Sequence, residues 1–237
     1  MYHKALTFTS LAATYTAQWN KRHAVVDQFD RAGESLVLNL AHGARLPAGQ
    51  AKLVALDYSL GSCLECAGCL DVAEIKALLP SKSAREQKEQ LSEIARMLIG
   101  LRKAWRDWAM QEDQSGYSVG TRQNVTSVFF HHESLEVYAA ALHLIAWFVQ
   151  LPEASHLSRR VFKQIDEYAT RIVLTIAEGN GRYSEMDHRR FLDMAETAAV
   201  KLAAYLDLAA ASHRLRAESC AMPKEILLRI VAMLSRM

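Results

Sequence analysis

Three cysteines follow one another at intervals of three residues, at Cys63, Cys66 and Cys69. The C-x2-C-x2-C spacing occurs in iron–sulfur sites, and Cys220 is a candidate fourth ligand. On a continuous helix these three positions spread over about 120° of the surface, so they cannot converge on one ion unless the helix unwinds. The alternative is a tightly packed helix, in which buried cysteine behaves as a small hydrophobic residue. We favour packing and expect no metal and no cofactor.

Two further groups of polar residues have side chains suited to metal binding or acid–base catalysis. His131-His132-Glu133 offers potential ligands, but adjacent side chains on a helix face apart, which favours a solvated helix start. Glu178, which precedes Gly179 and Arg182, is either an acid or metal ligand or the partner of Arg182 at a helix corner. We favour the corner, because no second carboxylate or nucleophile lies nearby at catalytic spacing.

Several classes of protein are disfavoured by the sequence. It contains no Gly-rich phosphate loop, no nucleophile elbow and no zinc-protease helix, so we expect a protein that is not an enzyme. The most apolar segment, Val137 to Leu151, is shorter than the roughly 20 residues of a bilayer span, so we expect no membrane span. Four cysteines in 237 residues do not resemble a secreted disulfide framework, which favours the reducing cytoplasm.

Basic residues are the remaining functional signal. The net charge of +2 does not identify a partner, but cations grouped on one face of a helical protein can contact phosphates without reading sequence. The alternative is an ordinary solvated surface, since Asp166, Glu167, Glu185 and Asp187 are interleaved with them. The candidate nucleic-acid-binding residues are Arg159, Arg160, Lys163, Arg171, Arg182, Arg189 and Arg190. In the first copy the basic residues that stand out are Lys21, Arg22, Arg102, Lys103 and Arg106.

The elements that position these residues are set out twice along the chain. Gln28-Phe29-Asp30 aligns without gaps with Gln164-Ile165-Asp166, and identities at the same spacing continue as far as Asp71 and Asp207. An internal repeat of this length predicts two copies of one supersecondary unit. With 51% hydrophobic residues and only 10 Gly and 4 Pro, each copy is rich in uninterrupted helical stretches.

We predict an all-α fold of two tandem up-down four-helix bundles, at residues 1–112 and 131–237, joined by a linker at 113–130. The predicted helices are 3–20, 24–43, 48–77, 83–111, 131–150, 155–179, 185–213 and 222–236. Gly43 and Gly179, at the ends of two helices, are predicted to adopt the left-handed backbone conformation. Ser81 and Ser184 are predicted N-caps. Prolines that cannot continue a helix are expected between helices, at Pro80, Pro152 and Pro223.

Motifs in both copies carry a family resemblance. Residues 31–43 and 61–65 resemble the second- and third-helix signatures of the four-helix-bundle proteins encoded in intervening sequences of bacterial large-subunit ribosomal RNA. Residues 176–182 of the second copy, with Phe191-Leu192, are similar to the same signatures. The resemblance implies a structural motif formed by Asn39, Gly43, Gly61, Ser62, Glu65, Glu178 and Gly179.

Each copy departs from the family pattern. His42 and Leu46-Pro47 replace motif residues in the first copy, and Thr175 and Thr197-Ala198 do so in the second. Single-bundle members of the family resemble ring-forming assemblies, which implies a homo-oligomer or hetero-complex. The related accessory variability proteins of diversity-generating retroelements bind a reverse transcriptase and its structured RNA, which implies the same kinds of partner here.

Two functions from different classes follow from these observations. The first is a non-enzymatic RNA-binding accessory or adaptor protein that partners a reverse transcriptase or ribonucleoprotein. The second is a protein-only oligomeric scaffold that uses apolar helix faces. Trp105, Trp108, Trp147 and Phe148 fit a core or an interface equally by spacing, and we favour the core. A metal or redox protein using the cysteine run is a distant third.

Overall fold

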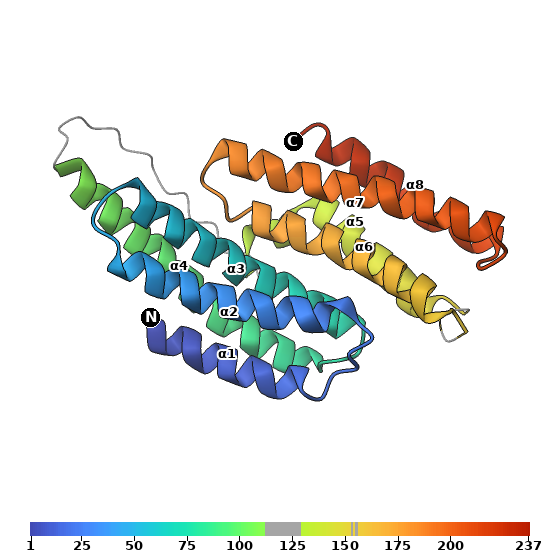
Figure 1. Ribbon diagram of the computed structural model, residues 1–237, viewed down its shortest axis with the longest axis horizontal. Coiled ribbons are helices and arrows are strands. Elements are labelled where there is room, and N and C mark those ends of the chain that lie inside the picture. The colour runs from blue at the N-terminus through green and yellow to red at the C-terminus, as the bar shows by residue number, and fades with distance from the viewer. Residues whose placement is uncertain (112–128, 153, 155) are drawn as a thin grey trace.

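The computed structural model describes residues 1–111, 129–152, 154 and 156–237. Within these residues the protein is all helical, with eight α-helices, one 3-10 helix and no β-strand (Figure 1). The elements are α1 (Tyr2–Thr16), α2 (Ala24–Arg45), α3 (Gln50–Ile75), α4 (Ser81–Gln111), η1 (His131–Ser134), α5 (Glu136–Gln150), α6 (Arg159–Gly179), α7 (Glu185–Ala211) and α8 (Ala217–Leu234).

The helices pack mainly with the members of their own copy. In the first copy α2 and α3 form the largest contact, flanked by α1 and α4, and in the second α6 and α7 do so, flanked by α5 and α8 (Figure 1). The two groups also touch, because α3 packs against both α5 and α6, and a continuous apolar core runs through both. The predicted linker falls mostly on residues 112–128, outside the described part of the chain.

α3 lies at the centre of these contacts. By length and composition it is the one described helix able to cross a membrane, but 78% of its most apolar window is buried by its neighbours. All three of its cysteines are buried, and Cys63 donates through Sγ to the carbonyl of Leu91 at 3.4 Å. Burial raises the pKa of each of these thiols, so they stay protonated. The cysteines therefore pack as hydrophobic residues of a core helix, as expected.

Aromatic residues are divided between core and partial exposure. Trp147 and Phe148 are buried, which confirms the core prediction for both. Trp105 is half-buried against the core, and the ammonium of Lys52 lies 4.1 Å from its ring centroid. The side chain of Trp108 lies outside the described residues.

Two predicted glycine conformations are wrong. Gly43 lies inside α2 and Gly179 is the last residue of α6, and neither has a positive φ. Glycine is required there by space instead: a Cβ on Gly43 would lie 3.1 Å from the Cβ of Ala55, and one on Gly179 would lie 2.7 Å from the Cβ of Phe191. Close approach of the following helix, not chain reversal, explains both positions.

Apart from Gly49, the positive φ angles of the described residues occur instead at two turns that repeat. Ala77, with φ 53°, follows α3, and His213, with φ 54°, follows α7. The two residues are 136 positions apart, the same spacing that relates Asp30 to Asp166. The backbone therefore repeats with the sequence, even where the residue types differ.

Some helix boundaries differ from the predictions. Ser184 is the N-cap of α7 and accepts the N–H of Asp187 at 3.4 Å, as predicted, whereas Ser81 is the first residue of α4 and the carbonyl of Pro80 accepts the first helical bond. Pro223 was expected between helices, but it lies inside α8, which begins at Ala217. Pro223 is buried on the same apolar stripe as Cys220 and Leu227. Burial of this stripe stabilises the helix by more than the missing N–H of proline destabilises it.

The stretch His131-His132-Glu133 was expected at a solvated helix start, and for His132 this is wrong. The stretch is part of the short 3-10 helix η1, which packs next to α5. His132 is 0% exposed. The ring of His132 stacks on Phe130 and meets the edge of Tyr138. Large aromatic neighbours on both sides, which helical spacing alone does not reveal, exclude water from this histidine.

Candidate nucleic-acid interface

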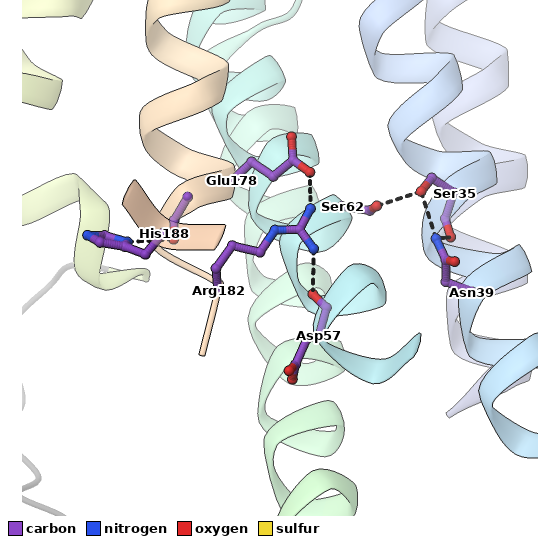
Figure 2. Close-up of polar contacts among 8 residues, drawn as sticks. Ser35, Asn39, Asp57, Ser62, Glu178, Arg182 and His188 are labelled. Atoms are coloured by element: carbon purple, nitrogen blue, oxygen red, sulfur yellow. Dashed lines mark hydrogen bonds and ion pairs between the residues drawn. The ribbon is translucent and has the colours of Figure 1, made fainter. Parts of the chain in front are cut away.

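Arg182 joins the two halves of the protein at the corner between α6 and α7 (Figure 2). Its guanidinium forms an ion pair with Glu178 on α6 and donates to the backbone carbonyl of Asp57 on α3 at 3.4 Å. Its side chain is only 4% exposed and lies between the rings of Tyr58 and Phe191. The predicted contact between Glu178 and Arg182 is formed. The bond from Arg182 to Asp57 connects the second copy to the first.

Two glycines make room for this contact. A Cβ on Gly61 would lie 2.9 Å from Cζ of Arg182, and a Cβ on Gly181 would lie 2.8 Å from Cδ1 of Leu64. Burial raises the pKa of Glu178, and Arg182 opposes that rise. The motif glycine and glutamate therefore serve packing between the copies.

Of the other polar motif residues, Ser62 ties α3 to α2, whereas Asn39 bonds within α2 (Figure 2). The hydroxyl of Ser62 donates to Oγ of Ser35 at 2.7 Å, and the Asn39 amide donates to the carbonyl of Ser35 at 2.9 Å. At the corner between α6 and α7, Nδ1 of His188 lies 2.8 Å from the carbonyl oxygen of Gly179. The Ser62 and His188 contacts therefore connect neighbouring helices.

A cleft between the start of α2 and the side of α6, with a volume of about 540 Å³, gathers cations from both copies. We call it the α2/α6 cleft. Its acidic residues are Asp27, Asp30, Asp166 and Glu167. Its cationic residues are Lys21, Arg22, Arg31, Arg159, Lys163 and Arg171.

Most of the acidic groups in the α2/α6 cleft are already paired. Asp166 binds the buried Lys76 at 2.5 Å, Glu167 lies 3.4 Å from Lys163, and Asp27 lies 3.1 Å from Arg31. Arg159 and Arg171 are exposed and form no ion pair with the described residues. The cleft therefore has unneutralised positive charge for an anionic ligand.

The first-copy wall of the cleft is held by packing. The guanidinium of Arg22 lies 3.5 Å from the ring centroid of Phe162 on α6 and donates to the carbonyl of Leu157 at 3.3 Å. Arginine in such a position keeps donors for phosphate oxygens while its plane covers the ring. This contact holds the two rows of cations at the same cleft.

The predicted cationic residues separate into three environments. Arg159, Lys163 and Arg171 line the α2/α6 cleft, with Arg160 exposed beside Arg159. Arg171 also lines a second depression, of about 260 Å³, together with Arg190. The remaining two are already engaged in ion pairs, with Arg182 buried against Glu178 and Arg189 lying 3.3 Å from Asp193.

Sequence reasoning missed two cations of this surface, Arg31 in the cleft and Lys201 in the second depression. Arg31 aligns in the repeat with Glu167, and Lys201 aligns with Glu65, so the equivalent positions carry opposite charge. The repeat therefore gave no signal for either residue. Only the packing of α2 against α6 brings Arg31 to the same cleft as Arg159.

Comparison with known families agrees with the repeated architecture. The model of one family, the 23S rRNA-intervening sequence proteins, matches residues 1–100 and again residues 133–236. The chain belongs to this family. Because the 23S rRNA-intervening sequence family matches twice, the two copies are tandem versions of one family unit. No curated protein and no solved structure matches this chain.

Proposed function

We propose that this chain is a non-enzymatic RNA-binding accessory protein whose α2/α6 cleft contacts the phosphates of a structured RNA. The observation that carries the proposal is the convergence of six cationic side chains from both copies on one cleft. Membership of a family named for intervening sequences of 23S rRNA supports RNA as the anion.

The proposal includes several finer expectations. Each copy acts as an up-down four-helix bundle, and the protein works in the cytoplasm. The resemblance to accessory variability proteins extends the partners to a reverse transcriptase. A rigid cleft built from both copies suits the shape of folded RNA, because phosphate contacts position a ligand without specifying its sequence.

The test captures RNA with the full chain. The tagged protein is recovered from its native host at moderate salt, and the bound RNA is sequenced. The cleft variant carries Arg159→Glu, Lys163→Glu and Arg171→Glu. The matched control carries Lys82→Glu, Lys103→Glu and Arg236→Glu, three exposed cations that do not line the cleft.

We expect enrichment of one structured RNA that the cleft variant loses and the control retains. With that RNA, each lost phosphate contact should lower the slope of log affinity against log salt by about 1, so by about 3 for the triple variant. Equal loss in both variants would show a non-specific effect of net charge. No enrichment with the unaltered protein would refute RNA binding at the cleft.

A second function is favoured by a different surface. Exposed apolar side chains line α7, at Met194, Val200 and Leu208. Met194 and Val200 align in the repeat with Tyr58 and Leu64 of α3, which contact the second copy at Arg182 and Gly181. A protein-only scaffold would use this face for self-assembly. It predicts, in the same preparations, a stable oligomer that retains no RNA and does not depend on salt.

A further inference from the structure

Three potential metal ligands come together where η1 covers the first copy, away from the α2/α6 cleft. Asp71 lies on α3, while His132 and Glu133 lie on η1. One ligand atom from each residue lies within 4.8 Å of the others. Among the residues that the structure describes, this is the one group of three histidine, cysteine or acidic side chains that is so close.

His132 has no hydrogen-bond partner for either ring nitrogen, although its side chain is fully buried. A buried polar group without a partner destabilises a protein, so such a group requires an explanation. Burial and then the charge of Lys88 lower the pKa of His132 to about 3. The ring is therefore neutral at physiological pH, which is the form that binds metal ions.

The two carboxylates are held in place by contacts from outside the group. The Tyr138 hydroxyl donates to Oδ2 of Asp71 at 2.7 Å, and the backbone N–H of Phe129 donates to Oε2 of Glu133 at 2.9 Å. Such outer contacts orient carboxylate ligands in metal sites. Each carboxylate keeps its other oxygen for a cation.

Lys88 currently supplies that cation. Its ammonium lies 2.8 Å from Oδ1 of Asp71 and 2.6 Å from Oε1 of Glu133. One positive charge leaves this pair of carboxylates with a net negative charge, whereas a divalent ion would balance both. A depression of about 440 Å³ beside Lys88, lined also by Glu74 and Phe129, gives a displaced ammonium space to move into.

We propose that Asp71, His132 and Glu133 bind a divalent transition metal ion, Zn²⁺ in the first instance, in exchange for the ammonium of Lys88. One imidazole and two carboxylates suit Zn²⁺, which accepts nitrogen and oxygen ligands at about 2.0–2.2 Å. Ligand atoms now within 4.8 Å of one another would close by about 1 Å around the ion. Binding would give His132 the partner it lacks.

The experiment measures metal binding by the full chain after treatment with a chelator. Zn²⁺ is titrated by calorimetry, and Co²⁺ serves as a spectroscopic probe, with thiolate absorption reporting any binding by the cysteines. His132→Leu removes a ligand and the unpartnered nitrogens together, so we expect it to fold and to lose the site. Lys88→Met removes the competing ammonium and leaves two carboxylates in mutual repulsion, so we expect Zn²⁺ to bind about tenfold more tightly or better.

The second copy provides the matched control. Asp207 and Lys224 form the equivalent ion pair, and among the described residues it belongs to no group of three potential ligands, so Lys224→Met should leave Zn²⁺ affinity unchanged. We expect one Zn²⁺ per chain and no thiolate absorption. The proposal fails if neither the unaltered chain nor Lys88→Met binds Zn²⁺, or if Lys224→Met tightens binding as much as Lys88→Met.

A folding control keeps the result decisive. Circular dichroism during heating establishes whether His132→Leu is folded, and Asp71→Asn replaces it if it is not. Binding that survives loss of either ligand in a folded protein would place the ion elsewhere and overturn the assignment.

Discussion

The same ion pair occurs in both copies of the protein, in opposite surroundings. Asp71 and Lys88 in the first copy are 136 residues before Asp207 and Lys224 in the second. The first pair has side chains 13% and 11% exposed, whereas the second has 63% and 40%. The difference comes from η1 and α5, because Glu133 on η1 also binds Lys88 and Tyr138 on α5 donates to Asp71. What covers a residue, and not only its type and register, therefore decides its electrostatic role.

A second pair of equivalent residues shows the same asymmetry. Asp166 is 1% exposed and accepts hydrogen bonds from the backbone N–H of Ala24 at 2.6 Å and from Lys76 at 2.5 Å. Its equivalent, Asp30, is exposed and accepts one from the hydroxyl of Thr16 at 2.7 Å. Burial favours a raised pKa for Asp166, but bonds from His23, Lys76 and Ala24 hold this pKa below its usual value. Asp166 is thus a charged contact between the two copies.

The largest expected effect tests this contact. Replacing Asp166 by alanine leaves the buried ammonium of Lys76 without its partner, so we expect the free energy of unfolding to fall by about 3–5 kcal/mol. The equivalent change, Asp30→Ala, should lower it by about 1 kcal/mol or less. Urea unfolding of both variants makes the comparison. Equal losses would mean that Asp166 has no special role between the copies.

The sequence predicted the parts of the fold that each copy determines by itself. Apolar stripes and the repeat located eight helices, and the Ser184 cap was recognised from local chemistry. Contacts between the copies were not predictable, because they depend on the packing of α3 against α5 and α6. The apolar pattern of a single helix does not show which other helix it packs against. Burial of His132 and Arg182 follows from those contacts. The candidate cleft was found in part, through Arg159, Lys163 and Arg171, but not its opposite wall at Arg31.

An intermediate effect is expected at the corner where the copies meet. Gly181 aligns with Arg45, which is exposed at the end of α2, so only the second copy needs glycine here. Gly181→Ala would place a Cβ 2.8 Å from Leu64 and close to the backbone of Gly61, and we expect a loss of about 1–3 kcal/mol.

Gly100→Ala is the matched control for that change, since this helical glycine faces open space. We expect it to stabilise the protein by about 0.5–1 kcal/mol, because alanine favours the helix. Thermal unfolding measures whether each variant is less stable or more stable than the unaltered chain. A neutral or stabilising Gly181→Ala would show that the corner has room to spare.

The smallest expected effect concerns equivalent residues of opposite charge, Glu65 on α3 and Lys201 on α7. Burial, and then the charge of Glu178, raise the pKa of Glu65 to about 8, while Arg31 and Arg182 oppose the rise. Between about pH 4.5 and about pH 8, the Glu65 carboxyl is therefore protonated in the folded protein and ionised in the unfolded chain. The resulting stability is fully present below about pH 4.5 and is lost as the pH rises through about 8.

Glu65→Gln removes this titration and keeps the neutral shape. We expect the variant to be more stable than the unaltered chain at about pH 9 and nearly equal to it at about pH 4.5. Lys201→Gln, at the exposed equivalent position, should change neither value. Urea unfolding of both variants at both pH values shows whether the pH dependence comes from the burial of Glu65. If Glu65→Gln destabilised the protein at about pH 9, the ionised carboxylate would be the favoured form between the copies, and Glu65 would share the role of Asp166.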